Sequence, residues 1–461
     1  MEDPHGEWLD GEELAEQARL HYEDGRLADA EAALRQAIHQ DPDRPDWHFN
    51  LGRILDRADR HAEARTAYLR CHQLDPEAPE PLLAAAGTHE AENECGAALR
   101  LIDQAIGLDR TSDDAHARKI GILLQMDRVD DARDAFYVAQ EFVEAPAMSL
   151  IAMAYVLKRE GDYARAVWCL REALRLEPEY LGVRTEYARC LARMGDHPKA
   201  LQNYMHVLRE SPGDIPALLG CAQLLAHMGR EAEAQEKLRR VVEIEPANGD
   251  AHHLLGLLSM RAARHEAAAV EFELVLKLDP ARNGVRIDLA DAQLRRGRVQ
   301  EARATLRDFL TQGIPSAPGA DGEETPADRE AATEQYRTII ARAGTLLAAT
   351  GMWQEAARVL ALLVEHEPKE ARAWRALARA RFEAGDLDGG RTAARQALEL
   401  DPRCAASYHN LALAALRTGH LDEAWRWVRG GLRVSRTDEG LRRLRSRVLL
   451  ARLRRALRLG R

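Results

Sequence analysis

Small, apolar and turn-forming residues recur along this chain with a period of 34 residues. With a recurring proline placed at position 32, twelve repeats follow; positions 8 and 20 hold small residues, and position 24 is always apolar. Position 8 is occupied by Ala18, Gly52, Ala86, Ile120, Ala154, Ala188, Ala222, Gly256, Ala290, Gly344, Ala378 and Ala412, of which one is large. Antiparallel helices approach closely only where their side chains are small. The pattern therefore predicts a helical hairpin in each repeat, with position 8 on the first helix and positions 20 and 24 on the second.

Two further columns mark where the expected helices end. Position 15 is Gly, Asn or Asp in every repeat except one, where Ala263 stands. These three residue types tolerate the positive φ that a helix C-cap favours. Phrases such as QLDP at 73–76 and ELDP at 399–402 close the second helices, because proline cannot continue a helix and disfavours helical geometry in the residue before it.

Breaks in the period divide the chain into parts. We expect an N-terminal leader at 1–10, repeats 1–9 at 11–312 and repeats 10–12 at 329–436, with an Arg-rich amphipathic helix at 437–461. The stretch 313–328 holds three Pro, three Gly and several acids, which is typical of a loop or hinge. It is either a surface loop within one continuous array or a hinge between two rigid blocks.

The sequence TPAD at 325–328 resembles a helix start. Thr325 would be the N-cap and Pro326 the first helical residue. The segment 436–461 holds ten Arg against Asp438 and Glu439, a net charge of +8, with Leu441, Leu444, Val448 and Ala451 on one helical face. Two interpretations remain open: a helix that caps the last repeat, or a basic amphipathic helix for an anionic membrane or an acidic partner.

Composition narrows the function. Apolar residues make up 46% of the chain and are mostly Ala and Leu, whereas aromatic residues make up only 5%. Because Ala and Leu are strong helix formers, we expect an all-α fold. The net charge of −10 argues against nucleic acid as the main partner. The acidic N-terminus lacks the apolar region of a signal peptide, no run of 18 apolar residues occurs, and six scattered cysteines suit reduced thiols. These features favour the cytoplasm.

Catalytic and metal-binding patterns are absent from the sequence. Phosphate-binding glycine loops, G-x-S-x-G and H-E-x-x-H do not occur, and no stretch outside the repeats is long enough for a catalytic domain. We therefore expect no enzyme, no cofactor, no metal site and no small-molecule substrate.

The columns resemble those of the tetratricopeptide repeat (TPR) family. The segment DWHFNLGRILDRADRHAEARTAYLRCHQLDP at 46–76 carries that family's L-G, A, Y and P at matching spacing, and the resemblance covers about residues 11–436. Repeat 4, at 113–146, departs most, with Lys119 and Ile120 at positions 7 and 8. The resemblance implies a right-handed α-solenoid, a superhelix of about twelve hairpins. Its first helices would line a concave groove through positions 2, 5, 6, 9, 12 and 13 and grip peptides or partner helices.

Carried over to this chain, those positions name candidate groove residues. The primary set is Arg342, Arg372, Arg375, Arg379, His409 and Asn410. The secondary set is Asn50, Arg53, Tyr155, Lys158, Arg159, Arg189 and Arg193, most of which form a cationic stripe in the middle repeats. Arg375 and Asn410 match half of the family's carboxylate clamp, and arginine often pairs with carboxylates in bidentate fashion.

These observations predict a non-enzymatic scaffold or adaptor. Its groove would bind an acidic peptide or a C-terminal carboxylate of a protein partner. The alternative is a peripheral membrane organiser held by Arg442–Arg461, and a nucleic-acid binder is less favoured because the body of the chain is acidic.

Overall fold

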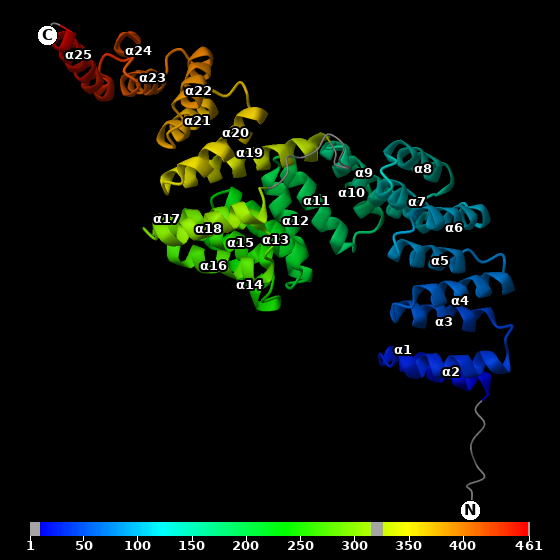
Figure 1. Cartoon of the computed structure of the whole chain (residues 1–461). Helices are drawn as coiled ribbons and strands as arrows, with labels where there is room; N and C mark the ends of the chain where they lie inside the picture. The colour runs from blue at the N-terminus through cyan, green and yellow to red at the C-terminus, as the bar shows by residue number, and fades with distance from the viewer. Residues whose placement is uncertain (1–9, 315–325, 460–461) are drawn as a thin grey trace, which may run out of the picture. The chain divides into compact units, whose positions relative to one another are not determined.

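The computed structural model describes residues 10–314 and 326–459, which form twenty-five helices and no strands (Figure 1). The chain divides into two compact units, each described by itself: residues 1–217 with 323–327, and residues 218–322 with 328–461. The first unit contains α1 (Gly11–Glu23), α2 (Leu27–Gln40), α3 (Pro45–Arg57), α4 (His61–Leu74), α5 (Glu80–Ala91), α6 (Cys95–Leu108), α7 (Asp113–Gln125), α8 (Val129–Phe142), α9 (Ala147–Arg159), α10 (Tyr163–Leu176), α11 (Leu181–Arg193) and α12 (His197–Glu210).

The boundary between the two units falls within helix α13 (Ile215–His227), and the second unit continues from there. The remaining helices are α14 (Glu231–Ile244), α15 (Gly249–Arg261), α16 (His265–Leu278), α17 (Asn283–Arg295), α18 (Val299–Gln312), α19 (Pro326–Ala349), α20 (Trp353–His366), α21 (Ala371–Glu383), α22 (Leu387–Leu400), α23 (Ala405–Arg417), α24 (Leu421–Val434) and α25 (Glu439–Leu459). Odd-numbered helices are the first helices of the hairpins, and their starts fall 34 residues apart almost throughout. Within each unit, hairpins stack in series, with a second helix against the next first helix, so the predicted all-α solenoid is confirmed.

The small residues at position 8 face the large residues at position 24 of the same hairpin. A Cβ added to Gly52 would lie 2.5 Å from the ring of Tyr68, and one added to Gly256 would lie 2.4 Å from Phe272. Each glycine therefore makes room for the aromatic ring opposite it. Repeat 4 fills the same place differently, because Ile120 is itself buried in one cluster with Phe136.

The turns between paired helices take the predicted conformation. All eight glycines at position 15 have positive φ, as do Asp59, Asn93 and Asp127. Ala263 adopts φ 54° as well, although alanine rarely enters this region. The stacking of the hairpins thus imposes the turn even where the residue does not favour it.

A contact that the sequence analysis did not anticipate supports the turn between repeats. The side chain at position 4 often bonds the backbone carbonyl of position 32 in the preceding repeat. His48 Nε2 lies 2.8 Å from the Pro42 oxygen, and Trp374 Nε1 donates to the Pro368 oxygen over 2.9 Å. The same bond recurs at His116, Arg184, His252, Arg286 and Arg442. Each of these side chains thus supplies a hydrogen-bond partner for a backbone carbonyl in the turn that follows a second helix.

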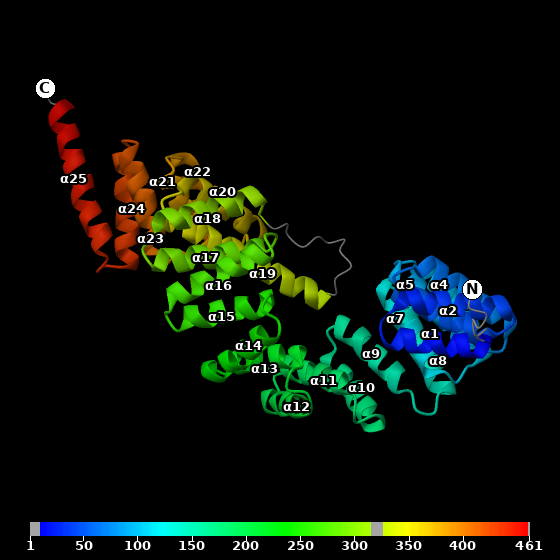
Figure 2. The ribbon, with the colours of Figure 1, turned by 90° about the horizontal axis from the view of Figure 1, so that it is seen from below.

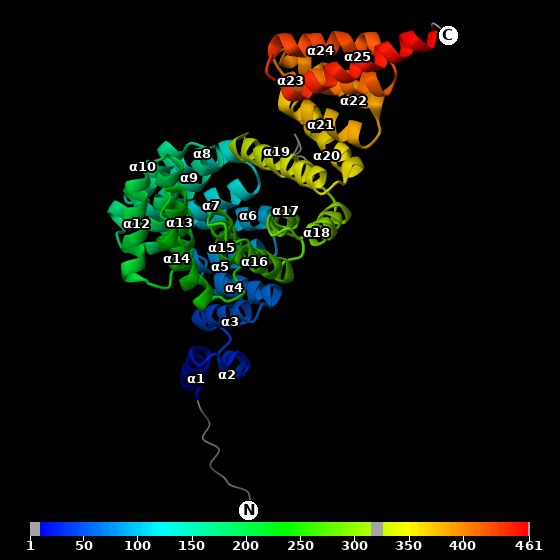
Figure 3. The same cartoon turned by 90° about the vertical axis from the view of Figure 1, so that its left-hand side faces the viewer.

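Helix α25 covers the last hairpin and confirms the predicted capping helix (Figures 2 and 3). Leu441, Leu444 and Val448 are buried, and the last two share a core cluster with apolar residues of α23 and α24. The second half of the helix differs, because Leu449 and Leu453 are 42% and 63% exposed. The cap therefore uses only part of the apolar surface of α25.

The insertion lies mostly outside the described residues. Helix α19 begins at Pro326, as predicted, three residues before the expected start of repeats 10–12, and it runs for 24 residues. Thr325, the leader 1–9 and most of the stretch 313–328 fall outside the described residues, so the choice between loop and hinge stays a prediction. Within the described part of the chain, no helix combines the length and hydropathy needed to cross a membrane.

Candidate functional site

Three cations of the predicted stripe in the middle repeats form ion pairs with acidic residues of the protein itself. Lys158 on α9 pairs with Glu186 on α11, and Arg189 bonds the same carboxylate over 2.6 Å. Arg159 donates to the backbone oxygen of Leu124 over 2.6 Å and lies 2.8 Å from the Asp127 carboxylate. Lys158 and Arg159 therefore join neighbouring hairpins, whereas Arg189 pairs within α11, and Glu186 offsets the charge of both Lys158 and Arg189.

The remaining residues of that stripe are also engaged. Tyr155 is 43% exposed with the Lys158 ammonium 4.6 Å above its ring, and partial burial raises the pKa of its hydroxyl. Arg193 donates to the Tyr163 hydroxyl over 3.3 Å. Sequence position alone predicted these residues as groove residues, but it did not predict their internal partners.

Arg342, on α19, reaches back to the preceding first helix. Its guanidinium lies 2.8 Å from Asp288 and 3.9 Å from Asp291, both on α17. Asp288 is buried and also lies 3.0 Å from His253 on α15. Arg342 thus compensates a buried carboxylate, and its role as a ligand-binding residue stays a prediction.

The arginines of α21 differ from all of these. We define the arginine face as Arg372, Arg375 and Arg379 of α21 with His409 and Asn410 of α23. Steps of three and four residues place the three arginines on one side of α21. Among the described residues, no carboxylate lies within ion-pairing distance of any of them, although Glu383 stands one turn beyond Arg379.

The contacts that these arginines do make are to uncharged groups. Arg379 lies over the ring of Trp353 at 5.7 Å, and Arg375 Nη1 donates to Cys404 Sγ over 3.6 Å. Burial acts to raise the pKa of the Cys404 thiol, but hydrogen bonds from Ser407 and Arg375 outweigh it and leave that pKa below its ordinary value. Arg372 is exposed and makes no bond to another described residue. The positive charge of this face is therefore available to a ligand.

Two features of this region were missed by the sequence analysis. Arg417 lies exposed at position 13 of α23, a groove position, and has no carboxylate partner among the described residues. Helix α25 begins 34 residues after α23 and packs on it as the first helix of a further repeat would, with Gly440 close to His409. The 34-residue step would have revealed both.

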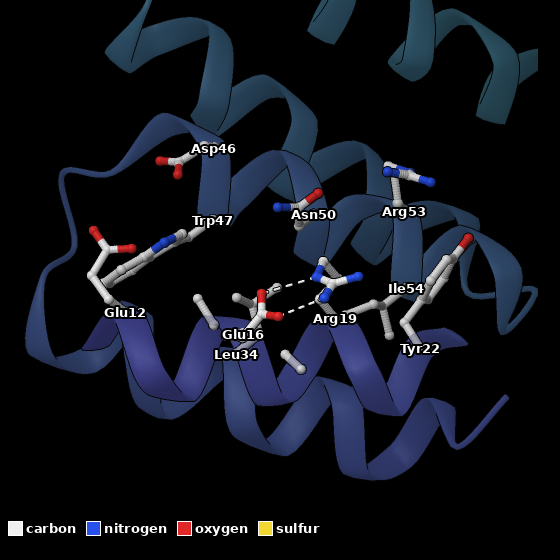
Figure 4. Close-up of a pocket in the computed structure, with 12 residues that line it drawn as sticks. Glu12, Glu16, Arg19, Tyr22, Leu34, Asp46, Trp47, Asn50, Arg53 and Ile54 are labelled. Atoms are coloured by element: carbon white, nitrogen blue, oxygen red, sulfur yellow. Dashed lines mark hydrogen bonds and ion pairs between the residues drawn. The ribbon is translucent and has the colours of Figure 1, made fainter. Parts of the chain in front are cut away.

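A pocket of about 350 Å³ lies between α1, α2 and α3 (Figure 4). We call it the N-terminal pocket. Buried Leu34, Trp47 and Ile54 form part of its floor, and exposed polar side chains form its rim. A Cβ on Gly11 would lie 2.5 Å from the Trp47 ring, so that glycine leaves the space in which the indole lies. Of its lining, Asn50 and Arg53 belong to the predicted secondary set, and Trp47 was missed.

All charged side chains on the rim of the N-terminal pocket except Arg53 are paired within the protein. Arg19 bonds Glu16, as the dashed lines of Figure 4 show, and holds the pKa of that carboxyl below its ordinary value. Arg44 lies 2.7 Å from Glu12 and 3.3 Å from Asp46.

Arg53 and Asn50, also on the rim, have no ion-pair or hydrogen-bond partner among the described residues. The guanidinium of Arg53 lies over the Tyr22 ring at 5.4 Å, and both Arg53 and Asn50 are exposed. The rim therefore leaves one cation, Arg53, and one neutral amide, Asn50, available to a ligand.

One cluster has the residue types of a metal site. His89, Glu92 and Glu94 bring three possible ligand atoms within 4.8 Å of one another. The guanidinium of Arg65 already lies 2.8 Å from Glu92 and 3.1 Å from His89, and His89 lies 2.6 Å from Glu94. A fixed cation thus takes the place that a metal ion would need, which makes this an ion-pair cluster.

Comparison with known proteins supports the repeat assignment. Family models described as tetratricopeptide repeat match residues 16–79, 157–202, 191–258, 259–311, 341–394 and 375–433, more than half of the chain. A search of curated protein sequences found no match.

Several solved structures resemble the chain at low identity. The APC/C hetero-tetramer Cut9–Hcn1 matches at 13% identity, with 96% of each chain covered and a TM-score of 0.39. Yeast Tom70 matches at 14% identity, with 97% of this chain and 96% of that chain covered and a TM-score of 0.37. YrrB, described as a TPR protein with an unusual peptide-binding site, matches at 22% identity over 41% of this chain and 96% of that one, with a TM-score of 0.33. We base the assignment on the repeat models alone: the chain belongs to the tetratricopeptide repeat family.

Proposed function

We propose that this protein is a non-enzymatic scaffold whose arginine face binds an acidic segment of a partner protein. The repeat family supports a protein-interaction scaffold in general and is not usually catalytic. The observation that carries the specific proposal is that Arg372, Arg375 and Arg379 have no carboxylate partner among the described residues, whereas three cations of the middle stripe, Lys158, Arg159 and Arg189, do.

Charge and geometry favour carboxylates as the ligand of this face. Three guanidinium groups on one side of a helix repel one another, and an acidic ligand removes that repulsion. Each guanidinium can bind a carboxylate through two parallel hydrogen bonds. Asn410, on the next first helix, adds an amide that can bond the main chain of an extended ligand.

The test is a pull-down from lysate of the source cell, read by mass spectrometry. The bait is wild type or the variant with Arg372, Arg375 and Arg379 changed to Glu. We expect at least one protein to be lost with the variant, and its acidic segment to bind wild type as a peptide. A matched control reverses Arg403, Arg429 and Arg433, which are exposed arginines of the same repeats outside the arginine face. Equal capture by wild type and the first variant would contradict the proposal.

A second candidate function rests on α25. Leu449, Leu450 and Leu453 are exposed on a helix rich in arginine, a combination that suits the surface of an anionic membrane. In this function the protein is a peripheral organiser, and in both we expect it to work in the cytoplasm. Truncating the helix would uncover the core around Leu444 and Val448, so substitution is the better test.

The leucine variant changes Leu449, Leu450 and Leu453 to Ser. We expect it to lose salt-sensitive binding to phosphatidylserine vesicles, with neutral phosphatidylcholine vesicles as the negative comparison. Changing the exposed Leu108, Leu278 and Leu400 to Ser provides the control. Equal vesicle binding by the leucine variant and wild type would remove this candidate.

A further inference from the structure

We infer that this protein binds a second copy of itself, with α25 of one chain lying on the outer side of α8 of the other chain. We define the α8 face as Asp134, Tyr137, Val138, Glu141 and Phe142, all of which are exposed. Because the contact joins two different surfaces, a chain can bind one copy through α25 and another copy through α8. The inference goes beyond the proposed function, since it names a new surface on α8 and a protein partner for α25.

The two helices carry matching apolar surfaces. Tyr137, Val138 and Phe142 of α8 are between 41% and 53% exposed. Within the described part of the chain, α25 is the one other helix with three exposed large apolar side chains, and these are Leu449, Leu450 and Leu453. Exposed apolar side chains gathered on one helix are typical of an interaction surface. If each set covered the other, both would be removed from water.

The spacing of these residues on α8 forms one continuous surface. Val138 stands four residues after Asp134 and four before Phe142, and Glu141 stands four after Tyr137, so the five residues share one side of the helix. The opposite side of α8 is buried against α7 and α9. Helix α8 is the second helix of its hairpin, so this surface is not part of the groove that the first helices line.

Two acids of the α8 face are available to a partner. Asp134 and Glu141 make no ion pair or hydrogen bond with another described residue. Asp130 and Asp131, nearer the start of the helix, are already paired with arginines of the same hairpin. A partner with unpaired cations beside its apolar residues would therefore complement this face.

Basic side chains near the α8 face leave these two acids uncompensated. The three arginines of α10, the second helix of the next repeat, are all paired with Asp162 or Glu172. Arg110 is the cation that contacts the face, because its guanidinium lies 5.7 Å from the centre of the Phe142 ring, and it has no carboxylate partner among the described residues. The face thus sets two unpaired acids against this one arginine.

Helix α25 shows the same pattern with the opposite charge. Leu441, Leu444 and Val448 are buried, so the exposed leucines lie on the other side of the helix. Arg447 stands three residues before Leu450 and Arg454 four after it, which places both on that exposed side. Neither arginine has a partner among the described residues. A row of leucines with two unpaired cations therefore meets an apolar row with two unpaired acids.

Charge also favours α8 over a second α25 as the surface that covers the leucines. Helix α25 holds eight arginines and one acid, so two α25 helices side by side would repel each other. Helix α8 holds four acids and one arginine. The contact is therefore between unlike surfaces, and the second candidate function differs from it, because a membrane would cover the leucines without any role for α8.

The test measures the size of the full-length protein by sedimentation velocity. A contact made by one helix of each chain is small, so we expect wild type to associate increasingly between about 1 µM and about 100 µM. The leucine variant lacks the α25 surface, and the α8 variant changes Tyr137, Val138 and Phe142 to Ser. Each variant alone should remain a single chain. An equimolar mixture of the two should form a complex of two chains, because each variant supplies the surface that the other lacks.

Two further comparisons sharpen the test. The control changes Ile244, Val270 and Leu278, exposed apolar residues of other second helices, to Ser and should associate as wild type does. Changing Asp134 and Glu141 to Lys should weaken association about tenfold, since each then repels an arginine of α25. Adding Arg447→Glu and Arg454→Glu to the same chain should restore it. These charge variants decide the matter if a Ser variant does not fold.

Each other outcome would overturn the inference. Wild type that stays a single chain over this range excludes the contact, and so does a mixture of the two variants that stays monomeric. Association by the α8 variant alone would mean that α25 pairs with another surface. Vesicle binding that needs the leucines, with no association of wild type, would give them to a membrane. The variant with Arg372, Arg375 and Arg379 changed to Glu should still associate, which separates failure of this contact from failure of the arginine face.

Discussion

The arginine face and the N-terminal pocket both lie on first helices of the repeats, yet they differ in how their charges are balanced. In the pocket, Glu16 is bonded by Arg19, Glu12 and Asp46 share Arg44, and Arg53 alone among the charged lining residues has no carboxylate partner in the described part of the chain. On the arginine face, Arg372 and Arg379 have no acid to neutralise them among the described residues. Most charges of the pocket are therefore compensated within the protein, whereas those of the arginine face remain available to a ligand, although the same fold supports both.

The cause of the difference lies in the next repeat. Lys158 meets Glu186, and His253 meets Asp288, and both acids stand at position 6 of the following first helix. The residue at position 6 that follows α21 is Asn410, which is neutral. In these two pairs the partner thus stands at position 6 of the next first helix, 28 positions after Lys158 and 35 after His253.

Salt should have the largest effect on ligand binding by the arginine face. We expect a fluorescent octapeptide of alternating Glu and Ser to lose about tenfold or more in affinity for the wild-type protein between about 50 mM and about 500 mM NaCl, because salt screens exposed charges. The variant with Arg372, Arg375 and Arg379 changed to Glu should bind the peptide weakly at both salt concentrations, with no comparable loss. Fluorescence anisotropy titrations measure both proteins, and equal salt dependence would contradict the role of the three arginines.

The fold could be predicted from the sequence because its determinants recur. Gly52 and Tyr68 stand at fixed positions of one hairpin, so the column pattern reveals their contact without any knowledge of other repeats. Even Ala263, the exception in its column, adopts the positive φ of the other turns, since the packed helices on either side impose it.

The sites were harder to predict because their properties depend on pairs of repeats. The sequence positions of Lys158 and Arg189 predict a cationic stripe in the middle repeats, but Glu186 forms ion pairs with both and compensates part of their charge. The signal was present in position 6 of the next repeat, but position numbers alone do not say which side chains meet. The pocket depends on Gly11 beneath Trp47, a single combination that no repeated column contains.

Removal of a paired arginine should lower stability, whereas removal of an unpaired arginine should leave it nearly unchanged. Arg159→Ala removes bonds to Leu124 and Asp127 that join two hairpins, and we expect it to lower the local free energy of unfolding by about 1 kcal/mol. Arg372→Ala removes no such bond and should stay within about 0.5 kcal/mol of wild type. Hydrogen exchange of amides in α7 and α9, and in α21 for the control, is the suitable measurement, because repeat arrays open locally. Equal loosening by the two variants would mean that the pairs do not stabilise the stack.

The smallest expected effect tests the cause directly. Asn410→Asp places a carboxylate in the register that joins His253 to Asp288, so it should pair with Arg375 and compete with an acidic ligand. We expect the Glu and Ser octapeptide to bind about threefold more weakly, since a partly exposed ion pair contributes about 0.5–1 kcal/mol. Asn50→Asp, the same substitution at position 6 of repeat 2, should leave that affinity unaltered. If Asn410→Asp binds as wild type does, the free charge of α21 has another cause than the neutral residue at position 6, and the difference between the two sites would need to be sought within α21 itself.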